Sequence, residues 1–111
     1  MSREEFQRYW FDVHGPLVRS YAEVLGIRRY VQVHTLADDV SAALRASRGA
    51  PEPFDGVAEL WYDSLEALGA AVASEAGRAA SRALLEDERR FIDHAASPLW
   101  FAEERPIVGH H

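Results

Sequence analysis

The chain contains no cysteine and no lysine, since all twelve of its basic residues are arginine. Without cysteine there are no disulfide bonds, thiolate metal ligands or cysteine nucleophiles. Without lysine, Schiff-base chemistry is excluded. No apolar run approaches the roughly 20 residues that a membrane-spanning helix requires, and the charged first residues do not resemble a signal peptide. These absences predict a cytoplasmic protein.

A basic cluster is also missing, and the net charge is −6. Nucleic acids and anionic membranes attract positively charged surfaces, so we expect neither as a partner. A length of 111 residues predicts one domain, which we assign to residues 1–108. The final residues 109–111, Gly-His-His, resemble the start of a purification tag and are left out of the site.

An amphipathic helix is predicted for residues 2–25. Ser2 and Glu5 have the spacing of a capping box, and Gly26 is placed to end the helix in the left-handed conformation. Apolar side chains recur at helical spacing at Phe6, Trp10, Leu17 and Tyr21. His14 falls on the same stripe, directly before a Gly-Pro pair. An imidazole on an apolar face indicates either a structural histidine or a site of chemistry.

Two strands with alternating side chains follow, over residues 27–36 and 55–63. The first carries Tyr30 and His34 on one face. Between the strands, residues 37–54 are irregular, with a short helix over 40–45 capped by Asp38 or Asp39, and we expect this excursion to lie at the surface as a flap over a pocket.

Two helical segments are predicted next, from Ser64 and from Ser74 to Asp93, and then a strand over residues 97–104. This order predicts an α+β sandwich with helices on one face of an antiparallel sheet. The other face would expose a patch too apolar to remain in water, which predicts sheet-to-sheet dimerisation. We assign to that patch Val31, Val33, Ala58, Leu60 and Tyr62.

Several blocks of the chain resemble the EthD-type family. They are residues 2–10, His14-Gly-Pro-Leu17, and residues 28–34, 54–63 and 87–93. The resemblance implies a ferredoxin-like sandwich that pairs into a dimeric α/β barrel. Related barrels include muconolactone-type isomerases, cofactor-free monooxygenases, polyketide cyclases and fungal pigment dehydratases, so the resemblance specifies the fold better than the reaction.

The chain departs from the family pattern at its beginning. Family members carry a β-strand before the first helix, whereas here the helix cap is already at Ser2. Either the natural start lies upstream, or another segment fills the position of that strand. The candidate segment is residues 100–108 of this chain or of a partner, which would be strand exchange.

We predict His14, His34 and Tyr30 as catalytic residues. Histidine is the commonest general acid–base group, because its pKa of about 6.5 lies near neutrality. The structural alternative for His14 is a bond to a backbone carbonyl around the Gly-Pro break. For His34 the alternative is a structural role, which is the more common one for a histidine at the end of a strand.

Substrate-binding side chains are predicted at Trp10, Glu59, Trp61 and Phe91, which we expect to converge with the histidines on one apolar pocket. The two tryptophans are also natural core residues. For Glu59 the alternative is a salt bridge to Arg28 or Arg29. The carboxylates at Asp87, Glu88 and Asp93 lie at a helix end that the macrodipole disfavours. We therefore expect arginines to hold them, either Arg89 or Arg90 or the arginines of the first helix.

The leading hypothesis is a cofactor-independent enzyme that moves protons on a small hydrophobic or phenolic molecule, as an isomerase, cyclase or dehydratase. The alternatives are a non-catalytic binding protein of a catabolic or polyketide pathway, and a cofactor-free oxygenase in which Trp61 and Tyr30 position a phenolate. No metal is expected, because His14 and His34 lie on separate elements. No cofactor is predicted, although some related barrels bind haem through one histidine.

Overall fold

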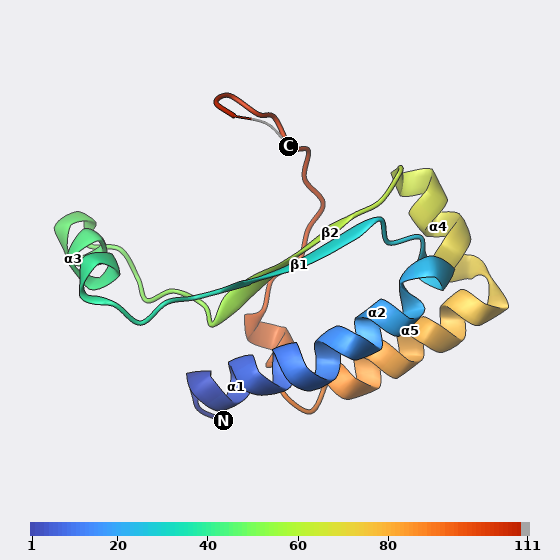
Figure 1. Ribbon diagram of the computed structural model, residues 1–111, viewed down its shortest axis with the longest axis horizontal. Coiled ribbons are helices and arrows are strands. Elements are labelled where there is room, and N and C mark those ends of the chain that lie inside the picture. The colour runs from blue at the N-terminus through green and yellow to red at the C-terminus, as the bar shows by residue number, and fades with distance from the viewer. Residues whose placement is uncertain (110–111) are drawn as a thin grey trace.

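The computed structural model describes residues 1–109; His110 and His111 of the suspected tag lie outside the described residues. The chain forms a long first helix, a β-hairpin and two further helices, with a small helix between the strands (Figure 1). The elements are α1 (Arg3–Tyr9), the π-helical turn η1 (Trp10–His14), α2 (Gly15–Leu25), β1 (Arg29–His34), α3 (Asp39–Arg48), β2 (Gly56–Trp61), α4 (Leu65–Ala73), α5 (Glu75–Glu88) and the 3₁₀ turn η2 (His94–Ala96).

The first helix begins and ends as its sequence predicts. Ser2 and Glu5 form the complete capping box, and Gly26 ends α2 with a φ of 71°. The middle of the first helix is not the continuous α-helix that we predicted. It contains the π-helical turn η1, in which the Gly15 N–H donates to the Trp10 carbonyl. Pro16 lacks the N–H that an α-helix would use here, and its ring crowds the carbonyl four residues before it. The wider turn accommodates both effects.

The two strands form a two-stranded antiparallel sheet. The register pairs Tyr30 with Leu60 and His34 with Gly56, so these residues share the face that is turned toward α1–η1–α2. The opposite, open face carries Arg29, Val31, Val33, Val57, Glu59 and Trp61. The predicted apolar patch therefore mixed two faces: Val31 and Val33 lie on the open face, but Ala58 and Leu60 lie on the helix side. Tyr62 follows β2 and lies outside this register.

Helices α2 and α5 lie side by side beneath the hairpin (Figure 1). Ala80 of α5 is completely buried, so its small side chain permits close packing at this position. Ser64 and Ser74 cap α4 and α5 through their side-chain oxygens, as predicted, and α5 ends at Glu88 rather than near Asp93.

Helix α3 is capped by Asp38 and lies at the far end of the hairpin, away from the other helices (Figure 1). It is therefore not the flap over a pocket that we expected.

The strand predicted over residues 97–104 is absent from the described chain. These residues extend from η2 without pairing to β1 or β2, and Leu99 and Ile107 are 91% and 90% exposed. A strand must pair its backbone with a neighbouring edge to complete its hydrogen bonds. This segment contacts the hairpin through the Glu104 side chain, which accepts from Trp61 Nε1, and it is not paired with either strand. The radius of gyration is consequently 16.1 Å, against about 13 Å for a compact domain of this length.

Candidate functional site

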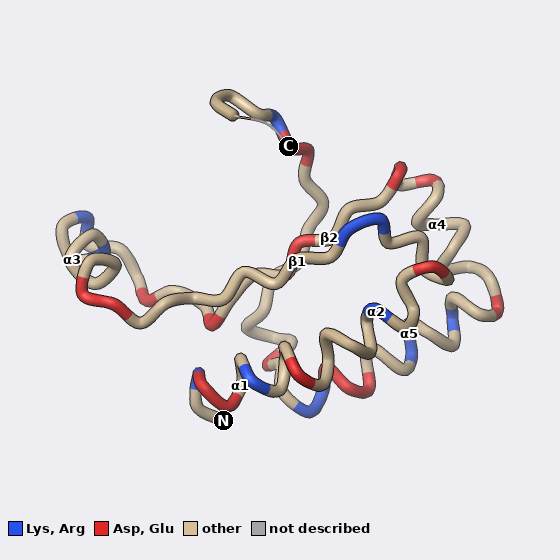
Figure 2. The backbone as a smooth tube through the Cα atoms, viewed as in Figure 1, with Lys and Arg blue, Asp and Glu red and all other residues tan. Residues whose placement is uncertain are grey.

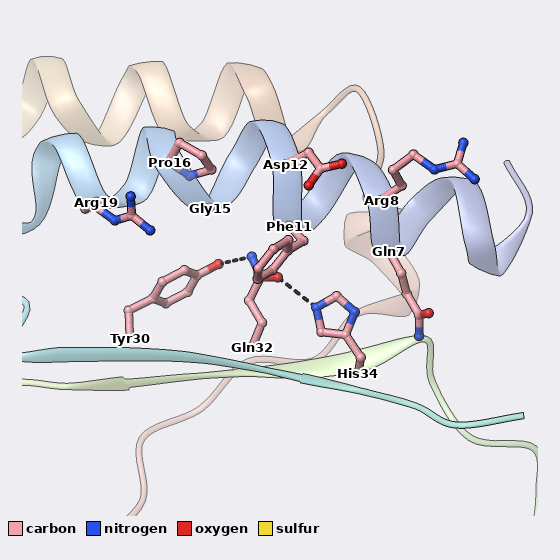
Figure 3. Close-up of a pocket in the computed structure, with 10 residues that line it drawn as sticks. All are labelled: Gln7, Arg8, Phe11, Asp12, Gly15, Pro16, Arg19, Tyr30, Gln32 and His34. Atoms are coloured by element: carbon pink, nitrogen blue, oxygen red, sulfur yellow. Dashed lines mark hydrogen bonds between the residues drawn. The ribbon is translucent and has the colours of Figure 1, made fainter.

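A groove of about 800 Å³ lies between the first helix and strand β1 (Figure 3). The helix contributes one wall, and the inward face of β1 contributes the other. Its lining residues are Gln7, Arg8, Phe11, Asp12, Gly15, Pro16, Arg19, Tyr30, Gln32 and His34. The groove combines apolar side chains with a few polar ones that converge on it, which is the usual composition of a small-molecule site.

Three polar side chains of β1 form one hydrogen-bonded row along this groove. The Gln32 Nε2 group donates to the Tyr30 hydroxyl and to the Trp10 carbonyl, each over 2.8 Å, while Gln32 Oε1 lies 2.8 Å from His34 Nε2. Tyr30, Gln32 and His34 are two residues apart in a strand, so their side chains point to the same face. Figure 3 shows the row running the length of the groove.

The Trp10 carbonyl determines which groups of this row donate hydrogen bonds and which accept them. A backbone carbonyl only accepts, so the Gln32 amide nitrogen must face Trp10 and the amide oxygen must face His34. His34 therefore carries hydrogen on Nε2, which leaves Nδ1 of the neutral ring as an acceptor. Tyr30 already accepts from Gln32 and keeps its own O–H for another partner. The row thus offers one base and one donor.

Burial raises the pKa of Tyr30, against the opposing effect of its hydrogen bond from Gln32. The phenol therefore stays protonated at neutral pH and remains a donor.

Close packing holds the row in place. The Trp10 ring stacks on His34 with centroids 4.6 Å apart, and it covers Gly56, where a Cβ atom would lie 2.5 Å from the ring. On the helix side, a Cβ atom on Gly15 would lie 3.3 Å from Gln32 Nε2. Gln7 also connects the first helix to the hairpin, because its side chain donates to the backbone carbonyls of Thr35 and Asp55. The two glycines therefore allow the helix to approach the hairpin closely.

His14 does not line this groove, contrary to our expectation that the two histidines converge. Its ring faces α5, where Nδ1 lies 2.8 Å from Asp87 Oδ2, and the Tyr9 hydroxyl donates to the other Asp87 oxygen. His14 and Asp87 are 4% and 7% exposed. The alternative of a bond to a backbone carbonyl is also wrong, since the partner of His14 is a carboxylate.

Asp87 is held by these two neutral or cationic partners rather than by arginines of the first helix. Burial by itself would raise the pKa of Asp87, but the hydrogen bonds from Tyr9 and His14 outweigh burial and lower it. Arg90 adds a weaker contact at 3.9 Å, and Glu88 lies between His14 and His94 at 3.7 and 3.5 Å. This buried cluster joins η1 to α5.

The predicted substrate-binding residues do not come together. Glu59 and Trp61 lie on the open face of the hairpin, opposite Tyr30 and His34, because the register pairs them with Val31 and Arg29. Arg29 lies over the Trp61 ring at 4.7 Å, and Arg28 pairs with Asp63 rather than with Glu59.

Trp10 and Phe91 are both buried core residues. Phe91 packs between Phe6, Tyr9 and His14 on the α5 side of the first helix.

Sequence reasoning missed several residues of the groove and of the buried cluster. Gln32 shares the alternating face of Tyr30 and His34, and that spacing was a usable signal. Phe11 and Arg19 lie off the apolar stripe of the first helix, so the sequence contained no signal that they line the groove. The pairing of Asp87 with His14 spans 73 residues and depends on how α5 packs.

Within residues 1–109, no group of three or more histidine or acidic side chains is placed to hold a metal ion. In the same range, no helix is both long and apolar enough to cross a membrane.

A hairpin covered on one face by helices, with a polar row facing a groove, defines a small mixed α/β protein with a candidate small-molecule site. The chain belongs to the EthD domain family, whose profile matches residues 1–95. No curated protein and no solved structure matches the chain significantly.

Proposed function

We propose that the groove binds a small hydrophobic or phenolic molecule and catalyses a proton transfer without a cofactor. The observation that carries this proposal is the shared contact of Gln32, which holds Tyr30 as a donor and His34 as a base along one groove. Membership of the EthD domain family agrees with a role in small-molecule chemistry. His14 has a positioning role in this proposal, because it is buried away from the groove.

In the proposed reaction, Nδ1 of neutral His34 takes a proton from a carbon atom of the substrate, and the ring becomes an imidazolium. The electron pair moves onto the carbonyl oxygen of the substrate, where the Tyr30 hydroxyl donates a hydrogen bond to the developing enolate. His34 then returns the proton to a different carbon. The composition of the substrate is unchanged, so the reaction is an isomerisation that proceeds through an enolate.

The test uses α-angelica lactone, whose conversion to its conjugated isomer requires the removal of a proton from one carbon and its return to another. We expect the wild type to accelerate the conversion and His34→Gln to lose about 100-fold or more of that acceleration. Tyr30→Phe is expected to lose less, because it removes a hydrogen bond rather than the base. His94→Gln is the matched control, since His94 lies outside the groove.

Two outcomes contradict the catalytic proposal in different ways. If the lactone shifts the His34 imidazole resonances in NMR but no conversion occurs, the protein is a non-catalytic binder of small molecules. If the lactone and a panel of phenols leave His34 unchanged, the groove is not a ligand site. The oxygenase alternative loses its argument, because Trp61 and Tyr30 lie on opposite faces of the hairpin.

We also propose that the protein is a homodimer through the open face of the hairpin. The chain exposes 8717 Å², against about 6,200 Å² for a folded monomer of this mass. The difference of about 2,500 Å² exceeds the roughly 800 Å² that each partner of a standard interface buries. The exposed apolar groups include Val33, Val57, Leu99, Trp100, Phe101, Ile107 and Val108.

Light scattering coupled to size exclusion tests the dimer. We expect twice the chain mass for the wild type and a monomer for Val33→Glu, which introduces a charge on the open face. Val40→Glu on α3 is the control, because Val40 is exposed but lies away from that face. A wild type that remains monomeric at high concentration would contradict the proposal.

A further inference from the structure

Two arginines of the first helix line the groove, and neither forms a salt bridge with another described residue. Arg8 and Arg19 have no carboxylate within salt-bridge distance among residues 1–109, whereas Arg3, Arg28 and Arg45 each do. Asp12 is the single acidic residue of the lining. The groove therefore carries a local positive charge on a chain whose net charge is −6, and Figure 2 shows that acidic and basic positions alternate along the first helix.

The hydrogen-bonding groups of the groove are unevenly distributed between its two ends. Both amide hydrogens of Gln7 and both of Gln32 are already used by carbonyls or by Tyr30. At the Tyr30 end the remaining groups are the Arg19 guanidinium and the Tyr30 O–H, and both are donors. Figure 3 shows these two side chains together at that end, with His34 at the other.

A carboxylate is the ligand group that matches such an end, because it only accepts hydrogen bonds and carries the opposite charge. Arginine is well suited to it, since the planar guanidinium donates two parallel hydrogen bonds to the two oxygens. The middle of the groove is apolar, with Phe11 and Pro16 on the helix wall. Phe11 already contacts His34 edge-on, with the ring centroids 6.0 Å apart. An aromatic ring of a ligand would therefore pack beside Phe11 along this apolar wall, not between Phe11 and His34.

We propose that the ligand of the groove is an aromatic carboxylate, with its carboxylate held by Arg19 at the Tyr30 end of the groove and the rest of the molecule extending along Phe11 toward His34, so that the Tyr30 O–H remains available to the substrate oxygen. This inference rests on the proposed function, because it names the class of molecule on which the Tyr30–Gln32–His34 row acts. It also gives Arg19 a role in specificity, by orienting the ligand so that the reacting end lies beside His34.

The experiment compares two probes of the same shape, 4-hydroxybenzoate and 4-hydroxybenzamide, with the full-length protein at low ionic strength. Binding is followed by calorimetry and by the shifts of the His34 imidazole. We expect the benzoate to bind about tenfold or more tightly than the benzamide, as is typical for a hydrogen bond to a charged group. Added salt is expected to reduce this preference.

Two arginine variants locate the effect. Arg19→Gln is expected to abolish the preference for the benzoate while leaving the affinity for the benzamide nearly unchanged. Arg48→Gln removes the same charge from the exposed end of α3 and is expected to keep the preference. Arg19 is exposed, so its replacement leaves the core intact, and circular dichroism verifies the fold.

The failure of this inference is distinguishable from the failure of the proposed function. If both probes shift His34 with equal affinity, or if Arg19→Gln keeps the preference, the carboxylate assignment is overturned and the groove remains a site for neutral molecules. If neither probe nor the lactone affects His34, the groove is not a ligand site, and both proposals are overturned together.

Discussion

His14 Nδ1 lies 2.8 Å from Asp87 Oδ2 in the contact between η1 and α5, and both side chains are buried. Tyr9 completes the arrangement by donating to the second oxygen of the same carboxylate. A buried carboxylate is costly unless it is paired and hydrogen-bonded. This cluster therefore stabilises one orientation of the first helix, and that orientation turns Phe11 and Arg19 toward the groove.

Replacing Asp87 with asparagine is expected to destabilise the protein at neutral pH by about 1.5–3 kcal/mol, the usual contribution of hydrogen bonds to a charged group. The pKa of Asp87 is lowered on folding. The ionised carboxylate therefore stabilises the fold at every pH above the ordinary pKa of aspartate, which is about 4. That contribution is lost as the pH falls from there through the lowered value.

Urea unfolding at a series of pH values measures this effect. The wild type should lose stability below about pH 4, and Asp87→Asn should lose less over the same interval. Asp63→Asn is the control, because Asp63 pairs with Arg28 at the exposed surface, where such pairs contribute little. Equal acid sensitivity of wild type and Asp87→Asn would contradict the assigned role of the cluster.

The neutral form of His34 is expected to carry its proton on Nε2, because Gln32 Oε1 accepts from that atom. Long-range ¹H–¹⁵N spectra of the imidazole distinguish the two tautomers directly. Gln32→Met should remove the preference and weaken the proposed activity. Gln7→Met is the matched control, since Gln7 also ties the first helix to the hairpin but does not contact His34. A wild-type ring protonated mainly on Nδ1 would exclude Nδ1 as the base.

Two helical glycines are expected to respond in opposite ways to alanine. A Cβ atom on Gly77 would overlap the Ala71 carbonyl, so Gly77→Ala should destabilise the protein by about 1–3 kcal/mol. Gly69 lies in α4 with no heavy atom near the added methyl, and Gly69→Ala should stabilise it by about 0.5–1 kcal/mol. Thermal or urea unfolding compares them, and a similar effect of both substitutions would contradict the close packing at the α4–α5 junction.

Gly56→Ala is expected to disturb the groove as well as the fold. The new methyl would lie 2.5 Å from the Trp10 ring and 2.6 Å from the Val33 carbonyl. Trp10 would then have to move from its stacked position on His34. We expect lower stability together with a changed His34 ring shift in NMR. An unchanged shift would show that the stacking does not position His34.

Local signals predicted most of the elements correctly. The capping box at Ser2, the stop at Gly26 and the serine caps of α4 and α5 depend on a few neighbouring residues, so the sequence contains all that they need. Alternation likewise predicted that Tyr30 and His34 share a face. Helical spacing also predicted correctly that His14 shares the buried side of the first helix with Trp10. It did not show that His14 faces α5 rather than the groove, because that depends on how α5 packs against the helix.

The sequence by itself therefore determined where the helices begin, where the two strands lie and which residues of β1 could act together. It did not determine the end of α5 or the conformation of residues 97–104. Only the tertiary structure decided that Glu59 and Trp61 lie on the other face of the hairpin, because that depends on strand register. It also decided that His14 is hydrogen-bonded to Asp87, whereas His34 is hydrogen-bonded to Gln32 and lines the groove. Such pairings join residues far apart in the chain, and they are set by how the helices and the hairpin pack.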